Sequence, residues 1–181
     1  MLHRVKALKG DAIIGDDGDV GSIEDLYFDP RRWGVCFLVL ATGPWGIGRK
    51  LMISPSSVKR SAPDARMRVR MTRKQVESNP EVGKNPGAGQ PDRAHLMSSA
   101  ELLGYGLEAP DGEIGHVEDF VVDDESWAIA DMVVDTRNWF PGGKRVLVPP
   151  TAVAEIDRPA KKVRVRLTRE EVRNSPEAEG R

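Results

Sequence analysis

Apolar side chains in this sequence follow the two-residue period of β-strands. Met67, Val69 and Met71 alternate with arginines, and the same alternation returns at residues 163–167, so one face of each strand is predicted to be buried. Longer runs are half-alternating or almost continuously apolar, which is typical of strands covered on both sides. These runs cover residues 20–28, 33–40, 114–122 and 127–134. The chain is therefore predicted to be all-β.

Two short helices are predicted where the strand period stops. Thr72-Arg73-Lys74-Gln75 and Thr168-Arg169-Glu170-Glu171 have the spacing of a capping box, in which the threonine and the fourth side chain satisfy free amides. Asn79-Pro80 and Ser175-Pro176 follow about two turns later, and proline ends a helix.

The whole pattern occurs twice along the chain. Residues 17–29 and 111–123 both begin Asp-Gly and continue in step with an offset of 94 (111 minus 17). Asp-Gly favours a tight hairpin because glycine accepts a positive φ. The offset holds for Gly10 and Gly104, Trp33 and Trp127, Thr42 and Thr136, and Trp45 and Trp139. It drifts to 96 at Thr72 and Thr168, which two one-residue insertions in loops explain. The chain is a tandem duplication.

A segment rich in proline and glycine separates the two copies. Residues 80–98 include Asn85-Pro86-Gly87-Ala88-Gly89-Gln90-Pro91 and show no hydrophobic period, so they are expected to form a flexible linker. The first domain is then residues 1–79 and the second is residues 99–181. Five or six short strands per copy leave exposed edges in a flat sheet, so each copy is expected to close into a small β-barrel.

Composition agrees with a folded, soluble protein, since hydrophobic residues are 39% and charged residues 30%. No segment approaches the roughly 20 consecutive apolar residues of a membrane-spanning helix, and residues 1–9 lack the apolar region of a signal peptide. The single cysteine, Cys36, lies in an apolar run. One cysteine can form neither a disulfide within the chain nor a cysteine-based zinc site. A cytoplasmic location is predicted.

The net charge of −1 hides an asymmetry between the copies. Residues 1–79 contain 14 Lys/Arg and 9 Asp/Glu, a net of +5, whereas residues 98–181 contain 11 and 17, a net of −6. Opposite charges on copies so alike favour docking of one on the other, either within one chain or head-to-tail between chains.

Several stretches resemble the PRC-barrel domain family. In the second copy they are Asp-Gly-Glu-Ile-Gly-His-Val-Glu-Asp-Phe at 111–120, Trp127 to Asp135, Thr136 to Lys144, Val146 to Pro149, and the closing Leu-Thr-Arg-Glu-Glu with Asn-Ser-Pro. The first copy departs at residues 42–48, where Thr-Gly-Pro-Trp-Gly-Ile-Gly replaces the Thr-Arg-Asn-Trp loop. The resemblance implies two tandem six-stranded barrels, each ending in a short helix, that serve as binding adaptors without conserved enzyme chemistry.

That family is similar to the cytoplasmic domain of the photosynthetic reaction-centre H subunit and to the C-terminal domain of a ribosome-maturation factor. The membrane helix of the former and the different N-terminal barrel of the latter have no counterpart in this sequence. Neither specific function is therefore carried over to this chain.

No residues are expected to catalyse a reaction, and neither a metal nor a cofactor is predicted. Neighbouring strand residues point to opposite faces, so neither Glu24-Asp25 nor Glu118-Asp119 converges on one ligand. Turn chemistry and solvated strand ends are favoured over a calcium site, because the EF-hand spacing is missing. Cys36 is expected in the core rather than as a nucleophile. The three histidines, His3, His95 and His116, lack metal-ligand spacing.

Arginines at alternate strand positions form a candidate anion- or RNA-binding face. They are Arg66, Arg68, Arg70, Arg164 and Arg166. Such a stripe is able to track phosphates, but no aromatic residues for base stacking lie between them. Solvated outer faces are therefore favoured over RNA binding.

Aromatic residues at two turns are the predicted partner-binding site. They are Trp45 in the first copy and, in the second, Trp139 and Phe140 beside Arg137 and Asn138. Turn aromatics are favoured interface anchors, while the alternative is that each ring plugs its own barrel, and the sequence leaves both open. The leading hypothesis is a non-catalytic cytoplasmic adaptor or scaffold for an unidentified protein. RNA or ribosome association is the second, and a role near the photosynthetic electron-transfer apparatus rests on the resemblance alone.

Overall fold

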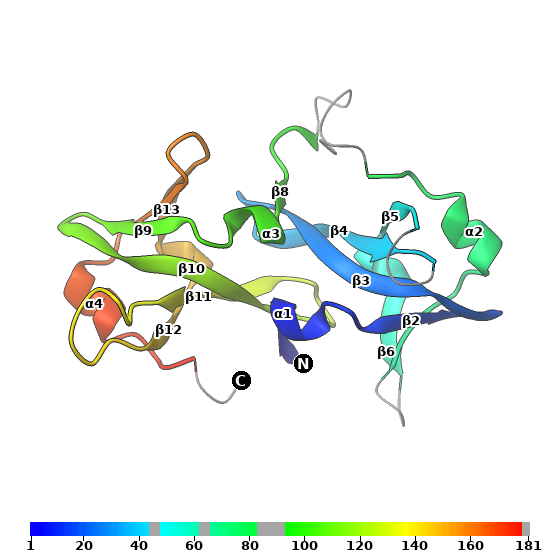
Figure 1. Ribbon diagram of the computed structural model, residues 1–181, viewed down its shortest axis with the longest axis horizontal. Helices are drawn as coiled ribbons and strands as arrows, with labels where there is room; N and C mark the ends of the chain where they lie inside the picture. Colours follow the sequence, from blue (N-terminus) through cyan, green and yellow to red (C-terminus); the bar gives the residue numbers. More distant parts are fainter. Residues whose placement is uncertain (44–47, 62–65, 83–92, 179–181) are drawn as a thin grey trace.

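A computed structural model describes residues 1–43, 48–61, 66–82 and 93–178. Figure 1 shows an elongated molecule with the second copy at the left and the first copy at the right. The molecule is mostly β, and its few helices are short. Within the described ranges, no helix has the length and apolar character needed to cross a membrane.

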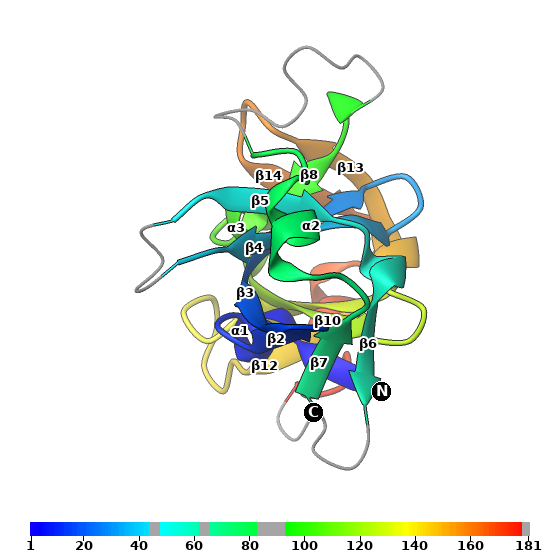
Figure 2. The ribbon, with the colours of Figure 1, turned by 90° about the vertical axis from the view of Figure 1, so that its right-hand side faces the viewer.

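The first copy forms one sheet in the order β5-β4-β3-β2-β7-β6. Its strands are β2 (Ala12–Gly15), β3 (Gly18–Asp29), β4 (Gly34–Ala41), β5 (Lys50–Ile53), β6 (Val58–Ser61) and β7 (Arg66–Val69). Neighbouring strands are antiparallel except β2 and β7, which are parallel. Helix α2 (Arg73–Glu77) follows, and in Figure 2 the strands curl around it at this end of the molecule.

The second copy repeats this topology in the order β12-β11-β10-β9-β14-β13. Its strands are β9 (Gly106–Ala109), β10 (Gly112–Asp123), β11 (Ile129–Asp135), β12 (Arg145–Val148), β13 (Val153–Asp157) and β14 (Lys162–Val165). Strands β9 and β14 are the parallel pair. Helix α4 (Arg169–Arg173) follows β14. The predicted helices at α2 and α4 both carry complete capping boxes.

The six strands predicted for each copy are present, but closure of each sheet into a barrel is not seen. Among the described residues, no ladder joins β5 to β6 or β12 to β13. A 3-10 turn makes each of these corners, η2 (Pro55–Ser57) and η4 (Pro150–Ala152). Proline lacks the amide donor that a continuing ladder needs, so each sheet curls around its core and remains open at this corner.

Glycines of the repeated motif fit where two strands approach closely. Gly21 and Gly115 have φ values of 141° and 154°, and a Cβ there would lie 2.6 Å from the Ala41 carbonyl oxygen and 2.5 Å from that of Asp135. Only glycine adopts this backbone without strain at such a contact, which explains why both copies have it.

The N-terminal segment of each copy crosses to the other copy. Strand β1 (Leu2–Arg4) pairs with β10 of the second copy, and β8 (Met97–Ser98) pairs with β3 of the first. Short helices, α1 (Val5–Leu8) and α3 (Ser99–Leu102), continue these segments. Each sheet therefore has seven strands, one of them contributed by the other copy.

Two tryptophans cross between the copies in the same reciprocal way. Trp33 packs in the hydrophobic core of the second copy, and Trp127 packs in that of the first. Both have a φ of 55°, a left-handed backbone that is uncommon outside glycine. The Val35 amide donates to the Trp127 carbonyl and the Ile129 amide to the Trp33 carbonyl, each at 2.8 Å. The two copies thus dock within one chain about a local two-fold axis.

Both ends of the predicted 80–98 linker are built into the sheets. Glu81 forms a β-bridge with Leu51 and the Val82 amide donates to the Lys50 carbonyl at 2.7 Å, while Met97 is 2% exposed. The exchange of strands explains the order at Met97, because residues that lead into the second copy also complete the first. The middle of the predicted linker, residues 83–92, lies outside the described residues.

Candidate functional site

The turn between β11 and β12 is fixed at its base by a buried threonine. Thr136 Oγ1 donates to the Lys144 carbonyl at 2.7 Å and accepts from the Lys144 amide at 3.1 Å. Within the turn, the Trp139 amide donates to the Thr136 carbonyl at 3.0 Å and the Gly143 amide to the Phe140 carbonyl at 3.1 Å. These bonds set the shape of the turn before any partner binds.

Arg137 strengthens the same turn through Asp135. Its Nη2 lies 2.6 Å from Asp135 Oδ2, and its Nε lies 3.0 and 3.1 Å from the two carboxylate oxygens. The hydrogen bonds from Arg137 outweigh the effect of burial and lower the pKa of Asp135 to about 2. Arg137 was predicted as a contact residue, and the structure shows that its guanidinium positions the turn.

The two aromatic rings of this turn have different environments. Phe140 is half-buried against the core of the second copy, and the Arg173 guanidinium lies 4.9 Å from its ring centre. Trp139 is 37% exposed, and its neighbour Asn138 is also exposed. Of the two roles that the sequence left open, Phe140 therefore covers its own core, whereas Trp139 faces solvent.

A hollow of about 450 Å³ adjoins the turn. It is lined by Phe140 and by charged residues that include Arg169 and Arg173 of α4. The Arg169 amide donates to Asp111 at 2.9 Å, which ties α4 to the Asp-Gly hairpin. The hollow next to Phe140 therefore carries charges of both signs, from Arg169 and Arg173 and from Asp111 and Glu170.

The corresponding turn of the first copy is built differently. Thr42 keeps its bond to the Arg49 carbonyl at 3.0 Å, but Ala41 and Gly43 replace the Asp135 and Arg137 of the second copy. The predicted site residue Trp45 lies outside the described residues. The ion pair between Asp135 and Arg137 is thus a feature of the second copy.

The candidate arginine face divides between the copies. Arg66, Arg68 and Arg70 are exposed on the outer side of the first copy, as the alternation predicts, with Met67 and Val69 buried behind them. In the second copy, acidic side chains surround Arg164, at 3.1 Å from Glu108, 2.7 Å from Glu155 and 3.1 Å from Asp157. Arg166 donates to the Thr151 and Val153 carbonyls. A shared anion-binding face is therefore not formed on both copies.

The paired carboxylates hold the exchanged segments. Asp25 accepts from the hydroxyls of Ser98 and Ser99 and from the Ala100 amide, and Asp119 accepts from the Lys6 amide at 3.1 Å. Burial raises the pKa of Asp119 more than its amide bonds lower it. Solvated strand ends were predicted here, and Asp119 is instead 3% exposed. In the described part of the chain, no three His, Cys, Asp or Glu residues are arranged to hold a metal ion.

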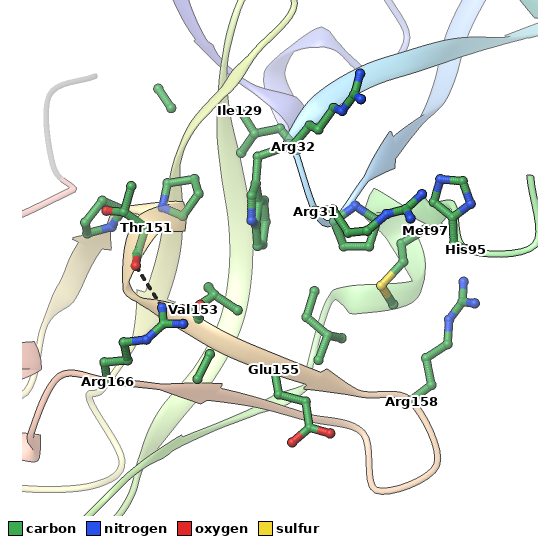
Figure 3. Close-up of a pocket in the computed structure, with 17 residues that line it drawn as sticks. Arg31, Arg32, His95, Met97, Ile129, Thr151, Val153, Glu155, Arg158 and Arg166 are labelled. Atoms are coloured by element: carbon green, nitrogen blue, oxygen red, sulfur yellow. Dashed lines mark hydrogen bonds between the residues drawn. The ribbon is translucent and has the colours of Figure 1, made fainter.

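A larger hollow lies elsewhere, at one junction between the copies. This groove measures about 960 Å³, and its rim carries Arg31, Arg32, Arg158 and Arg166. The sequence analysis did not identify it, because its walls come from the β3–β4 turn of one copy and from β13 and η4 of the other (Figure 3). A signal was present in the sequence: the turn reads Pro-Arg-Arg in the first copy and Asp-Glu-Ser at 124–126 in the second.

Comparison with known families bears on the half of the chain that carries the aromatic turn. The sequence pattern of the PRC-barrel domain matches residues 106–172. Residues 106–172 are therefore similar to the PRC-barrel domain family. The PRC-barrel match runs from β9 into α4 and so includes Trp139 and Phe140, whereas Arg173 and Asn174 of the hollow lie just beyond it. No curated protein matches the chain.

Proposed function

We propose that this protein is a non-catalytic cytoplasmic adaptor that binds a partner protein through the aromatic turn of its PRC-barrel half. The observation that carries the proposal is the Trp139 side chain, which is 37% exposed on a turn that hydrogen bonds hold in place. Tryptophan is among the residue types most enriched at interface hot spots. A turn that is already ordered loses little conformational entropy on binding.

The surroundings of Trp139 indicate the chemistry of a partner. The adjoining hollow is lined by Arg169 and Arg173 together with Asp111 and Glu170, so an apolar group over the indole and a polar group of mixed charge toward α4 make a complementary surface. The free thiol of Cys36 suits a reducing compartment.

The test is crosslinking from the turn in the organism of origin. Benzoylphenylalanine placed at Asn138 captures proteins that contact the turn, and the captured set is compared after Trp139→Ala. The control is Leu103→Ala, because Leu103 is also 37% exposed but lies on a different surface. We expect Trp139→Ala to abolish the main crosslink and Leu103→Ala to retain it. Equal crosslinking yields in both variants would exclude the turn as the binding site.

A further inference from the structure

The two copies meet at two junctions that the local two-fold axis relates, and one of them is filled by an ion-pair network. There Asp124, which is 7% exposed, accepts from Arg60 Nε and contacts His3 Nε2, both at 2.8 Å. The amino group of Met1 lies 2.9 Å from the same carboxylate. Burial disfavours the charged carboxylate, but these hydrogen bonds outweigh it and keep the pKa of Asp124 below its usual value.

At the other junction, uncharged residues occupy the corresponding positions. The 94-residue offset relates Asp124 to Pro30 and His3 to Met97. The strand register relates Arg60 to Ile156, because Arg60 pairs with Met67 and Ile156 pairs with Val163. The position of Asp124 thus has no carboxylate counterpart here, although the neighbouring Asp29 lies 3.4 Å from His95 and 3.3 Å from Arg31, and the groove of about 960 Å³ occupies this place.

The groove combines an apolar floor with a cationic rim. Trp33, Met97 and Ile129 lie at its base and are at least nine-tenths buried. Figure 3 shows Arg31, His95 and Arg158 gathered at one end of the groove and Arg166 at the other.

Carboxylates of the chain already pair with part of this rim, since Arg158 lies 3.0 Å from Glu101 and His95 lies 3.4 Å from Asp29. Glu155 is the acidic residue among those that line the groove, and it pairs with Arg164 at 2.7 Å on the sheet face. The partner of Arg31 is Asp29, at 3.3 Å, and the Arg31 side chain is 69% exposed. Such exposed ion pairs are weak, so Arg31 is able to exchange its partner for a carboxylate of a ligand.

One wall of the groove is the open edge of a sheet. Four consecutive residues of β13, 153–156, line the groove, whereas side chains of a strand alternate between faces. The wall therefore includes the strand backbone. In the described ranges, β13 pairs with β14 and with no other strand. An unpaired edge is a template for an added strand, with alternate side chains of the added segment giving specificity.

We propose that this groove binds an extended acidic segment of a partner protein. The segment adds to the edge of β13, places apolar side chains on the floor beside Trp33, and directs a carboxylate to Arg31. A carboxylate of the bound segment then accepts hydrogen bonds from a cation at this junction, as Asp124 does at the other. The surface is separate from the aromatic turn, and the proposal is independent of the function assigned to Trp139.

The test is fluorescence anisotropy of the full chain with a fluorescein-labelled peptide, Glu-Val-Asp-Ile-Glu-Val-Asp. Two probes serve as comparisons: the same peptide with lysine at every acidic position, and a labelled oligothymidine of similar charge. We expect the acidic peptide to bind, its affinity to fall as salt is added, and the lysine peptide not to bind. In hydrogen exchange, the bound peptide is expected to slow the amides of β13.

Two variants locate the site, and a third is the matched control. Arg31→Glu reverses a rim charge, and Pro30→Asp installs the carboxylate that position 124 supplies at the other junction. Each is expected to weaken binding of the acidic peptide about tenfold or more, as loss of a charged hydrogen bond does. Glu125→Ala, at the position corresponding to Arg31, and Trp139→Ala are expected to bind as the unaltered chain does.

Three results would overturn the proposal. The first is no binding of the acidic peptide at millimolar concentration, and the second is unchanged affinity in both Arg31→Glu and Pro30→Asp. The third is that the oligothymidine binds more tightly than the acidic peptide and that Arg31→Glu and Pro30→Asp abolish this binding. That result would assign the groove to nucleic acid. Because Trp139→Ala is expected to retain peptide binding, failure of the groove proposal and failure of the aromatic-turn proposal are separate results.

Discussion

Replacing Trp127 by alanine is expected to destabilise the copy that does not contain it. The indole is 5% exposed and belongs to the core of the first copy. A buried tryptophan removes about 200 Å² from water, worth about 5 kcal/mol at about 25 cal/mol per Å², and such truncations cost about 3–5 kcal/mol. Alanine keeps the backbone at φ 55°, so the loss comes from packing.

Urea unfolding combined with hydrogen exchange measures both the size and the place of this loss. We expect the free energy of unfolding to fall by about 3–5 kcal/mol and exchange to accelerate in β3 and β4, which contribute Leu26 and Leu38 to the core around Trp127. The matched control is Trp139→Ala, the same substitution at an exposed site in the same copy, with an expected change within about 0.5 kcal/mol.

The reasoning is refuted if Trp127→Ala accelerates exchange only in the second copy, or if it costs no more than Trp139→Ala. Either result would mean that the indole does not contribute to the core of the first copy.

Three further predictions concern residues that shape the turn and the exchange. Arg137→Ala should raise the pKa of Asp135 from about 2 toward 3.8. Because the ionised carboxylate stabilises the folded state, the free energy of unfolding of the unaltered chain should approach that of the variant as the pH falls from about 4 to about 2. A constant difference in the free energy of unfolding over that range would contradict this. Asp25→Ala removes the acceptor of four donors, three of them in the β8–α3 segment, and should cost about 1–3 kcal/mol in urea unfolding, with faster exchange in α3; normal protection of α3 would count against it. Gly115→Ala places a Cβ 2.5 Å from a carbonyl oxygen and should cost more than about 1 kcal/mol in thermal unfolding, whereas Gly106→Ala, which meets nothing within 4 Å, should cost less.

The repeat and the positions of strands and helices along each copy follow from signals that are local in sequence. Alternating burial at Met67 and Val69 is confirmed, and so are both capping boxes. These features depend on periods of a few residues, which a sequence displays directly. The matched family likewise agrees with the motifs of the second copy.

The exchange between copies was not predictable by the same means. Trp33 and Trp127 fit equally well as strand residues of their own copy, and only the positive φ at each turns the ring toward the other copy. Strand β8 lies within the predicted linker and was not predicted either, since Met97-Ser98 is too short to show a hydrophobic period. Closure of each barrel was inferred from strand number alone, which says nothing of the proline corners at η2 and η4.

The aromatic turn was identified from the sequence, but the separate roles of its residues were not. Exposed Trp139 and half-buried Phe140 are adjacent, and the choice between them depends on where the core of the second copy ends. The groove is lined by residues more than a hundred positions apart, such as Arg31 and Glu155, which the sequence does not place together.

The central claim is that exchanged strands and tryptophans make the two copies one cooperative unit. Hydrogen exchange of the full chain across a urea series tests it most directly, with β4 reporting on the first copy and β11 on the second. We predict that both strands lose protection at the same urea concentration. Loss of protection throughout one copy while the other stays protected would contradict the claim.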